Sequence, residues 1–385
     1  MPAPSRTYST DVAAAGSVRS DSLRRVESAL LRVLIEARGD ASPRPDERLA
    51  AVGNWLAARG AHAELRREEI DRVSRRYGHV GPPPSVVLAQ GGYDTPSQAE
   101  VLVRKVLSGI PGNLPINRYA IVQRELAGLT TLAVLVASVE LTLLPVPRHM
   151  SRQDMLRLAG SLAPRFNETR LAVTLPHGDV RTFERPGRDF TADLRLDVPG
   201  VYEIELLGDG PSGPVVVANF PVYVDTAEEY EPLQVSPLPS PKVSEDDTSL
   251  TPARVEEQLF VLLNADRGRA NVGRLQPDDE LARVARSHSQ DMANHNFFGH
   301  VSPTKGTPED RVRRARLSGL LAYGENVVLA GNAQGAHQAL MDSPGHRGNM
   351  LRAEYTEVGI GAVVDASDRT GRRFAVTYLF AQRMK

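Results

Sequence analysis

Three side chains in the last third of this 385-residue chain have the types needed for chemistry: His300, Glu325 and His346. They stand in the stretches NFFGH, YGEN and SPGHRGNML. Two neutral imidazoles and one carboxylate can supply three protein ligands to a divalent metal, with water in the fourth position. The same trio can act without metal as a general acid and base in a cleft. The separations of 25 and 21 residues match no local metal-binding motif, so spacing alone leaves both interpretations open.

Each of the three residues also has an ordinary structural explanation. His300 lies in a predicted loop, where it can bond to a backbone carbonyl. Glu325 lies in a predicted Gly-Glu-Asn turn, where a following helix N-terminus would favour a carboxylate. His346 follows a Ser-Pro-Gly turn and can bond to nearby backbone. The trio forms a site only if that turn brings His346 towards the other two residues, which is what we expect.

Other polar residues of the same region are assigned structural positions. Apolar periodicity predicts a helix from about Asp279 to Asn294, with His288 on its apolar face. We therefore expect His288 to be buried and hydrogen-bonded, and His295, just past the helix, to lie in solvent. Ser302 and Ser343 are candidate nucleophiles, but neither stands in a strand–turn–helix nucleophile elbow.

The composition excludes several classes of function. A formal net charge of -1 argues against nucleic-acid binding, which needs an excess of Lys and Arg. The absence of cysteine excludes disulfides, thiolate metal sites and cysteine nucleophiles. The first residues contain no apolar run typical of a secretory signal, which predicts a cytoplasmic protein or a mature form without its signal. The apolar stretch 126–146 contains Glu140 and several hydroxyl residues, so it predicts two buried strands rather than a membrane span.

Periodicity and turn residues divide the chain into successive segments. The first segment lacks periodicity and is predicted to be disordered, and the second combines helical and β-rich patterns. The third consists of short β-rich runs between Gly and Pro turns, which predicts a small sandwich of immunoglobulin-like type. The fourth is rich in Pro, Ser and acid and is predicted to be a linker. In order, the four segments cover residues 1–22, 23–150, 160–228 and 229–252, and the last domain covers residues 253–385.

The sequence also indicates an internal repeat. Residues 31–57 and 259–289 both run from an apolar helix through an Arg/Gly loop to Pro-Asp, and then to Leu-Ala-x-Val. The β-rich ends of the two regions correspond more loosely. The first copy would lack a counterpart of residues 343–351, and it has no histidine between residues 80 and 147. We therefore expect it to be a related fold without the site.

Five ordered motifs in residues 253–385 resemble the CAP superfamily in its bacterial SCP-like branch: SHSQDM, FFGHVSP, YGENV, SPGHRGNML and YTEVGIGAVV. The resemblance implies an α+β domain built as a three-layer α-β-α sandwich, with a cleft lined by two histidines and acidic side chains. His300, Glu325 and His346 match the first cleft histidine, the motif glutamate and the second cleft histidine. Eukaryotic members have a further glutamate before the second histidine, and the nearest acid here is Asp342.

The resemblance implies an exported protein, extracellular or periplasmic, and leaves three functions open. The first is a non-catalytic binding module whose His300, Glu325 and His346 hold a divalent cation, zinc or calcium. Its partners would be extracellular or cell-envelope ligands such as peptidoglycan, protein or lipid. The second is a hydrolase in which Glu325 is the general base on a water polarised by metal or by the two histidines, cleaving a peptide or peptidoglycan bond. The third is lipid or sterol binding, for which we find no exposed apolar stripe. We expect the binding module first.

Overall fold

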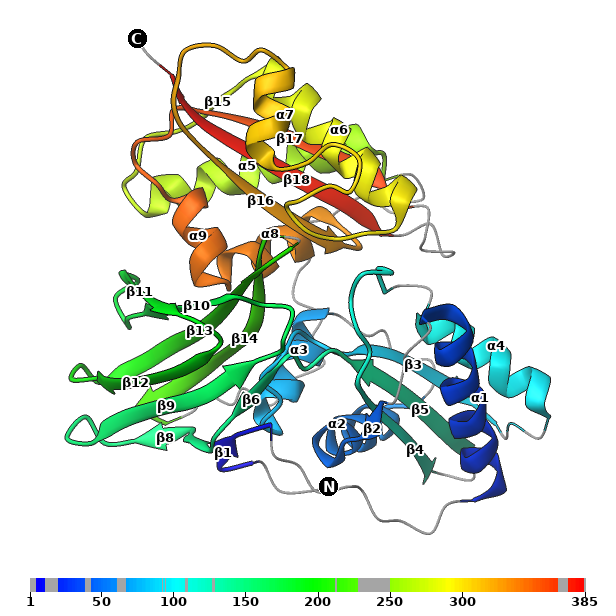
Figure 1. The fold of residues 1–385 in the computed structure, drawn as a ribbon. Helices are drawn as coiled ribbons and strands as arrows, with labels where there is room; N and C mark the ends of the chain where they lie inside the picture. Colours follow the sequence, from blue (N-terminus) through cyan, green and yellow to red (C-terminus); the bar gives the residue numbers. More distant parts are fainter. Residues whose placement is uncertain are drawn as a thin grey trace.

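The computed structural model describes residues 5–10, 20–38, 43–60, 67–91, 93, 95–107, 110–126, 129–211, 213–227, 250–365 and 373–383. It contains two α/β units and, between them in the sequence, a unit built from strands (Figure 1). Within the first 22 residues, Thr7–Tyr8 form strand β1, which pairs with β7 (Val146–Pro147), and Tyr8 is buried. The prediction of disorder is therefore wrong at this point, because the Tyr8 ring packs into an apolar core. The predicted linker, except for its last three residues, lies outside the described residues.

The N-terminal unit is a four-stranded sheet with helices on both faces. The strand order is β2-β4-β5-β3, and the apolar faces of α1 and α4 pack on one side while α2 and α3 pack on the other. The stretch predicted as two strands does form β5 and the later β6, and no helix among the described residues is long and apolar enough to cross a membrane. The elements of the unit are α1 (Asp21–Arg38), β2 (Arg44–Pro45), α2 (Glu47–Ala57), α3 (Arg67–Arg76), β3 (Ser85–Gln90), α4 (Pro96–Leu107), β4 (Arg118–Leu126) and β5 (Leu129–Ala137).

The β unit consists of strands around one apolar core. Sheet β12-β9-β6 contributes to this core together with strands β13-β14-β8 and the hairpin β10-β11. Strand β12 alternates between exposed and buried residues, as expected where one face of a strand packs inward. The core also takes in strands that precede residue 160, and the immunoglobulin-like type stays a prediction. The elements are β6 (Leu141–Leu143), β7, β8 (His149–Met150), β9 (Met155–Leu162), β10 (Glu168–Thr174), β11 (Val180–Pro186), β12 (Asp189–Arg195), β13 (Gly200–Gly210) and β14 (Gly213–Val224).

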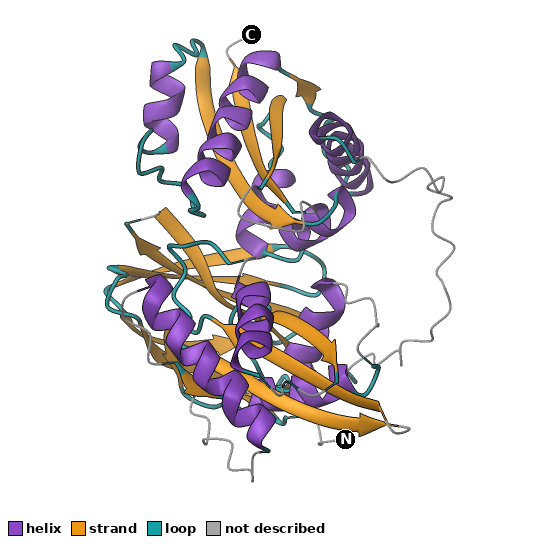
Figure 2. Ribbon diagram, turned by 90° about the vertical axis from the view of Figure 1, so that its right-hand side faces the viewer, coloured by secondary structure: helices purple, strands orange, loops and turns teal. Residues whose placement is uncertain are grey.

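The C-terminal unit is a three-layer arrangement of helices, sheet and helices (Figure 2). The sheet order is β15-β17-β18-β16, with α5 and α8 packed on one face and α6 and α7 on the other. Strand β16 is therefore an edge strand. The elements are α5 (Pro252–Arg269), β15 (Gln276–Pro277), α6 (Asp279–His295), α7 (Pro308–Arg314), β16 (Leu320–Ala330), α8 (Ala333–Met341), α9 (Pro344–Met350), β17 (Glu357–Val364) and β18 (Phe374–Arg383).

The sheets of the two α/β units have the same connectivity. In each, a two-residue strand pairs in parallel with the third strand of the unit, which pairs antiparallel with the fourth, which pairs antiparallel with the second. In each, an Asp directly after the short strand caps the next helix: Asp46 caps α2 and Asp278 caps α6. Helix α9 has no counterpart among the described residues between α4 and β4.

Glycines in β17 allow α6 to lie directly on the sheet. A Cβ atom at Gly361 would lie 2.1 Å from the backbone nitrogen of Arg286, and one at Gly359 would lie 2.0 Å from that of Ala282. Real Cβ atoms do not approach backbone so closely, so these two positions accept only glycine. The two glycines of the motif VGIGAVV are thus required by the close contact between α6 and β17.

We predict that Gly361→Ala lowers the free energy of unfolding by about 1–3 kcal/mol, because the added methyl group overpacks the contact with α6. Urea-induced unfolding followed by circular dichroism measures this change. The matched control is Gly348→Ala in α9, where a Cβ would meet nothing within 4 Å. An alanine there should stabilise the helix by roughly 0.5–1 kcal/mol. Equal effects of the two substitutions would contradict the packing argument.

Candidate functional site

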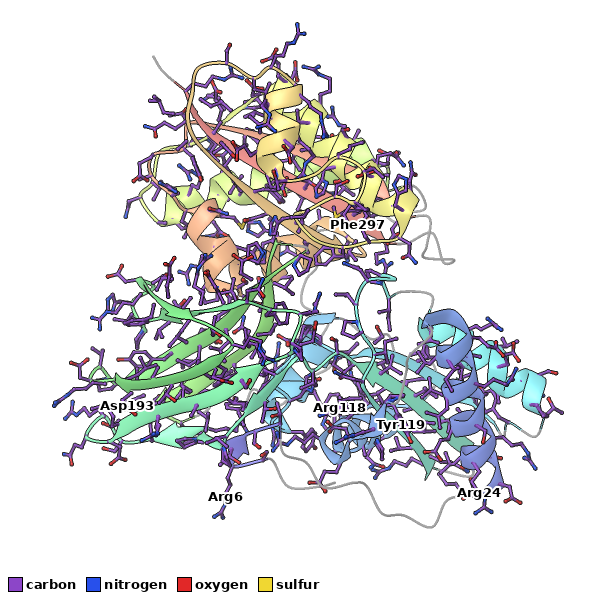
Figure 3. The ribbon with its side chains drawn as sticks, viewed as in Figure 1. Arg6, Arg24, Arg118, Tyr119, Asp193 and Phe297 are labelled. Atoms are coloured by element: carbon purple, nitrogen blue, oxygen red, sulfur yellow. The ribbon has the colours of Figure 1, made fainter. Side chains whose placement is uncertain are left out.

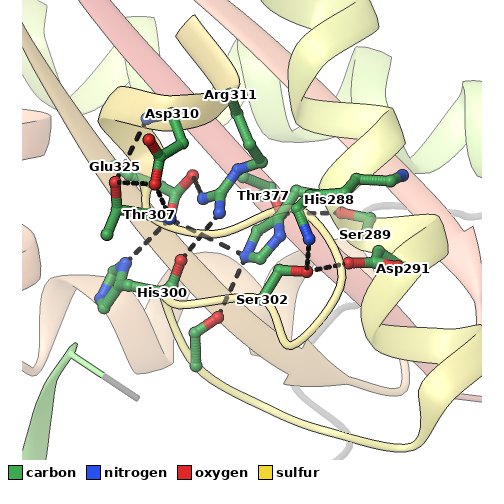
Figure 4. Close-up of polar contacts among 12 residues, drawn as sticks. His288, Ser289, Asp291, His300, Ser302, Thr307, Asp310, Arg311, Glu325 and Thr377 are labelled. Atoms are coloured by element: carbon green, nitrogen blue, oxygen red, sulfur yellow. Dashed lines mark hydrogen bonds and ion pairs between the residues drawn. The ribbon is translucent and has the colours of Figure 1, made fainter. Parts of the chain in front are cut away.

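Glu325 lies near the middle of edge strand β16, and the side chains of His300, Arg311 and His288 converge on it (Figure 4). His300 Nδ1 lies 2.9 Å from Glu325 Oε1, and Arg311 Nη2 donates to Oε2 at 2.6 Å. The prediction that Glu325 lies in a turn is wrong, because residues 322–330 pair continuously with β18. Burial alone would raise the pKa of Glu325, but the hydrogen bond from His300 and the charge of Arg311 outweigh it and hold the pKa below its ordinary value.

Arg311, which the sequence analysis did not single out, organises this part of the site. It lies on α7, whose start is fixed by a capping box between Thr307 and Asp310. Its Nη1 donates to the carbonyl oxygens of His300 at 2.9 Å and Gly306 at 2.8 Å, while Nη2 pairs with Glu325. One buried guanidinium therefore holds both ends of the loop that carries His300.

Ser302 is a structural residue of the same loop. Its hydroxyl donates to Asp291 Oδ2 and accepts from the backbone N–H groups of Thr304 at 3.0 Å and Lys305 at 2.7 Å. The Ser302 side chain is buried, and Asp291 lies on α6. The hydroxyl is therefore committed to fixing the loop, and a nucleophilic role for Ser302 has no support.

His288 is buried and hydrogen-bonded, as predicted. Its Nε2 lies 3.0 Å from the carbonyl oxygen of Gly299 and 3.9 Å from Glu325 Oε1. Burial lowers the pKa of His288 to about 4, and the charge of Arg311 adds to this. The residue is neutral at neutral pH and supports the backbone next to His300. His295 is half exposed and pairs with Asp291.

His346 lies on α9, so the segment predicted as a turn is a short helix. Its Nδ1 lies 2.7 Å from Ser343 Oγ, and its backbone carbonyl accepts from Asn326 Nδ2 at 2.9 Å. Asn326 follows Glu325 on β16, and successive side chains of a strand point to opposite faces of the sheet. Glu325 therefore binds the His300 segment on one face, and Asn326 binds the His346 segment on the other. Burial, and then the nearby His300, lower the pKa of His346 to about 3.

A carboxylate from the β unit holds the start of α9. Glu205 of β13 accepts from Ser343 Oγ at 2.5 Å through Oε2 and from the backbone N–H of Gly345 at 2.9 Å through Oε1. Ser343 stands at the N-cap position but makes no side-chain cap bond of its own. Glu205, contributed by another unit, therefore takes the place of the capping residue. The sequence analysis did not identify it.

His300 and His346 line one pocket of about 310 Å³, to which all three units contribute. The N-terminal unit contributes its loop 110–116, and the β unit contributes the start of β14, residues 214–217. Gly213 lies close enough to His300 that a Cβ there would be 3.1 Å from the histidine Cβ. Most of the other lining side chains are apolar, among them Ile110, Leu114, Val215, Val327 and Leu329. The structure thus brings the two predicted histidines to a junction of units.

The loop of the N-terminal unit is fastened to the segment before His300. Asn113 Nδ2 donates to the carbonyl oxygen of Phe298 at 2.7 Å, and the Phe298 N–H donates to Asn113 Oδ1 at 3.0 Å. The Gly112 N–H donates to the Asn296 carbonyl oxygen at 2.9 Å. Figure 3 labels Phe297 in this segment, at the side of the C-terminal unit that faces the other two. One wall of the pocket is therefore held in place by the N-terminal unit.

Charged groups of all three units meet beside the pocket. Arg75 of α3 pairs with Asp71 at 2.7 Å and with Glu203 of β13 at 3.4 Å. Burial raises the pKa of Glu203 to about 7 in spite of Arg75, and Asp342 at the end of α8 adds to the rise. Burial likewise raises the pKa of Glu205 to about 7. Asp342 is the acid nearest the missing cleft glutamate, and it lines the pocket.

The predicted metal site is not supported by this arrangement. No three His, Asp or Glu side chains among the described residues are grouped so that they could hold a metal ion. Glu325 already accepts from His300 and Arg311, so a cation would have to displace a guanidinium bound at 2.6 Å. We therefore derive no chemistry from a zinc or calcium ion.

Comparisons with known proteins give one family match, which lies in the C-terminal unit, and curated relatives that match about a third of the chain. A model of the CAP family, described as the cysteine-rich secretory protein family, matches residues 260–380. The uncharacterized protein YkwD of Bacillus subtilis (strain 168) is 35% identical over 136 residues, which cover 34% of this chain and 52% of that protein. The uncharacterized membrane protein YlbC of the same organism is 32% identical over 134 residues, 34% of this chain and 38% of that protein. The chain thus spans about half or less of the length of these relatives.

Solved structures are similar at lower identity. An extracellular protein containing a SCP domain from Bacillus anthracis str. Ames is 20% identical, with 64% of this chain and 87% of that chain covered and a TM-score of 0.32. An outer surface protein from Borrelia burgdorferi is 17% identical, with 35% of this chain and 97% of that chain covered and a TM-score of 0.32.

We predict that His346 stays neutral at pH 5 in the folded protein, because burial holds its pKa at about 3. Nitrogen-15 NMR of the labelled imidazole, recorded from pH 8 to pH 4, measures its protonation. The control is the same chain in urea, where the ring should titrate near its ordinary pKa of about 6.5. A midpoint near that ordinary value in the folded protein would contradict the buried position of the ring.

We predict that Arg311→Met destabilises the protein by about 3–5 kcal/mol, because it leaves the buried Glu325 carboxylate without its cation. Urea unfolding measures the loss. The double variant Arg311→Met with Glu325→Gln removes the charge as well, so it should lose less stability than the single variant. A double variant that is less stable than the single one would show that the ion pair is not the reason for the loss.

Proposed function

We propose that this chain, whose residues 260–380 form a CAP domain, is an extracellular or cell-envelope binding module with its ligand site at the junction of the three units. The observation that carries the proposal is the pocket of about 310 Å³ lined by His300, His346 and apolar side chains of all three units. Ligand sites are concave and largely apolar, with a few placed polar groups, and pockets of about 300–1,000 Å³ are typical. The volume lies at the low end of that range, so lipid or sterol binding stays the third interpretation.

A binding role is favoured over a catalytic role for Glu325, because the carboxylate is already hydrogen-bonded to His300 and Arg311. Both of its oxygens accept charge-assisted hydrogen bonds, and its pKa is held below the ordinary value. A general base works best when its pKa lies near the working pH and it can reach the proton it removes. Glu325 meets neither condition, so its role is to hold His300 and Arg311.

A hydrolase acting on a peptide or peptidoglycan bond is the second candidate, and one observation favours it. A carboxylate can only accept, so the bond to Glu325 Oε1 places a proton on His300 Nδ1. In the neutral ring, His300 Nε2 is then an acceptor on a residue that lines the pocket. In this version His300, and not Glu325, would be the general base.

We also infer that the N-terminal unit is a degenerate copy of the CAP fold. The shared connectivity of the two sheets supports this, as do the matching caps Asp46 and Asp278. The copy lacks a described equivalent of α9, and the loop that stands in its place carries Asn113, which holds Phe298. The degenerate copy would then serve to complete the site of the other copy.

Purified peptidoglycan fragments, mixed peptides and lipid vesicles, each incubated with the full chain, separate the candidate functions. We predict retention of a cell-envelope ligand without turnover, and at least tenfold weaker retention by His300→Ala and His346→Ala. His295→Ala is the matched control, because His295 lies in the same unit but does not line the pocket. Affinity is measured by calorimetry and turnover by mass spectrometry.

Product formation that is lost in His300→Ala would replace the binding module by the hydrolase. Retention that is unchanged in both pocket variants would remove the pocket as the site.

A further inference from the structure

The two pocket histidines are held in the same way, each through its Nδ1 atom and ultimately by a glutamate. His300 Nδ1 bonds directly to Glu325 Oε1. His346 Nδ1 bonds to Ser343 Oγ, which in turn bonds to Glu205 Oε2. The first glutamate belongs to the C-terminal unit, whereas the second is fully buried and comes from the β unit.

The hydrogen atoms in the second chain of bonds can be assigned by counting donors. An ionised Glu205 can only accept, and it accepts from the Gly345 N–H through Oε1 and from the Ser343 hydroxyl through Oε2. The Ser343 hydroxyl has a single proton, which is then used. Its oxygen can only accept from His346, so His346 Nδ1 must carry the ring proton. His346 Nε2 is left with a lone pair.

The two Nε2 atoms are available to a ligand. Neither has a hydrogen-bond partner in the described part of the chain, and both residues line the pocket. A further lining residue, Asn219, donates through Nδ2 to the Asp342 carbonyl oxygen, while its Oδ1 is a buried acceptor without a partner. The polar groups left open here are therefore mostly acceptors. Three arginines also line the pocket, and each pairs with a carboxylate: Arg75 with Asp71 and Glu203, Arg165 with Glu140, and Arg373 with Asp365. Among them, Arg75 Nε is a buried donor without a partner in the part of the chain that the structure describes.

We propose that Glu205 is the specificity-determining residue of the pocket. Through Ser343 it fixes His346 as the Nδ1–H tautomer, so that His346 and His300 both present Nε2 acceptors. The ligand group recognised there is an uncharged hydrogen-bond donor, a hydroxyl or an amide N–H. An anionic or purely accepting group is rejected, because it would face lone pairs with no proton between them. This inference rests on the proposed binding function and names the chemistry of its ligand.

The charged side chains that line the pocket give no excess of positive charge for an anion. Arg75 of α3 and Glu203 of β13 act electrostatically on Glu205, and Asp71 and Asp342 act on Glu203 beside it. The charged side chains that line the pocket are balanced, with Asp71, Glu140 and Asp342 against Arg75, Arg165 and Arg373. The choice between ligands therefore rests on the two Nε2 acceptors. Burial raises the pKa of Glu205 to about 7, so the side chain is ionised at pH 8.5.

Nitrogen-15 NMR of labelled histidine in the full chain at pH 8.5 tests the assignment, because the two neutral tautomers give different pairs of ring shifts. In the wild type we expect Nδ1–H for both His300 and His346. In Glu205→Gln the amide Nε2 donates to Ser343, whose hydroxyl proton then turns to His346 Nδ1. His346 should therefore change to the Nε2–H tautomer while His300 stays as it was, which also controls for folding. A wild-type His346 in the Nε2–H form, or the same tautomer in both proteins, overturns the proposal.

The ligand class is tested with acetamide, which donates hydrogen bonds, and N,N-dimethylacetamide, which does not. In the wild type, acetamide should shift the His346 Nε2 resonance and dimethylacetamide should not. In Glu205→Gln the Nε2–H of His346 can donate to the carbonyl oxygen of either amide, so the two probes should no longer differ. No response of the wild type to acetamide, or equal responses of the wild type to the two probes, overturns the donor class. The tautomer measurement needs no ligand, so it can fail while retention of a cell-envelope ligand holds, and the reverse also applies.

Discussion

The ion pair between Glu325 and Arg311 is the interaction on which the rest of the site depends. A carboxylate with only 5% of its side chain exposed needs a partner, since an unpaired buried charge costs several kcal/mol. Arg311 supplies it, and the same guanidinium bonds to the His300 and Gly306 carbonyl oxygens. Loop, helix α7 and strand β16 are thereby held as one piece, and His300 takes the orientation that Glu325 imposes.

The same constraint connects the units of the chain. Glu205 of the β unit is buried, and its carboxylate accepts from Ser343 and Gly345 at the start of α9. The N-terminal unit joins the junction through hydrogen bonds between Asn113 and the backbone of Phe298. Buried polar groups of one unit are thus hydrogen-bonded by another unit. These bonds fix the relative position of the units, whereas an apolar contact alone would let them shift against each other. A pocket between such units has walls that are fixed relative to one another.

Much of the C-terminal unit could be predicted from the sequence, and the failures have physical reasons. The helix carrying His288 was predictable, because apolar periodicity and a capping Asp define it locally. Glu325 was placed in a turn because Gly-Glu-Asn has turn composition, but pairing with β18 outweighs that local preference. Helix α9 contains one Pro and two Gly, and contacts with Asn326 and Glu205 stabilise it from outside.

Two residues of the site could not be found by reading along the chain. In β13, Glu203 and Glu205 alternate with buried Tyr202, Ile204 and Leu206, which is the pattern of a strand with one face in solvent. Contacts with other units cover that face: the start of α9 at Glu205 and Arg75 of α3 at Glu203. Arg311 stands among exposed arginines of α7, and no local signal separates it from them.

The central claim is that the other units complete the pocket of the C-terminal unit, and hydrogen exchange at the Phe298 amide tests it most directly. This N–H donates to Asn113 across the junction at 3.0 Å. The account predicts a protected amide in the full chain and clearly faster exchange in Asn113→Ala, with the Gly361 amide in β17 unchanged. Fast exchange at Phe298 in the wild type, or equal rates in the two proteins, would contradict it.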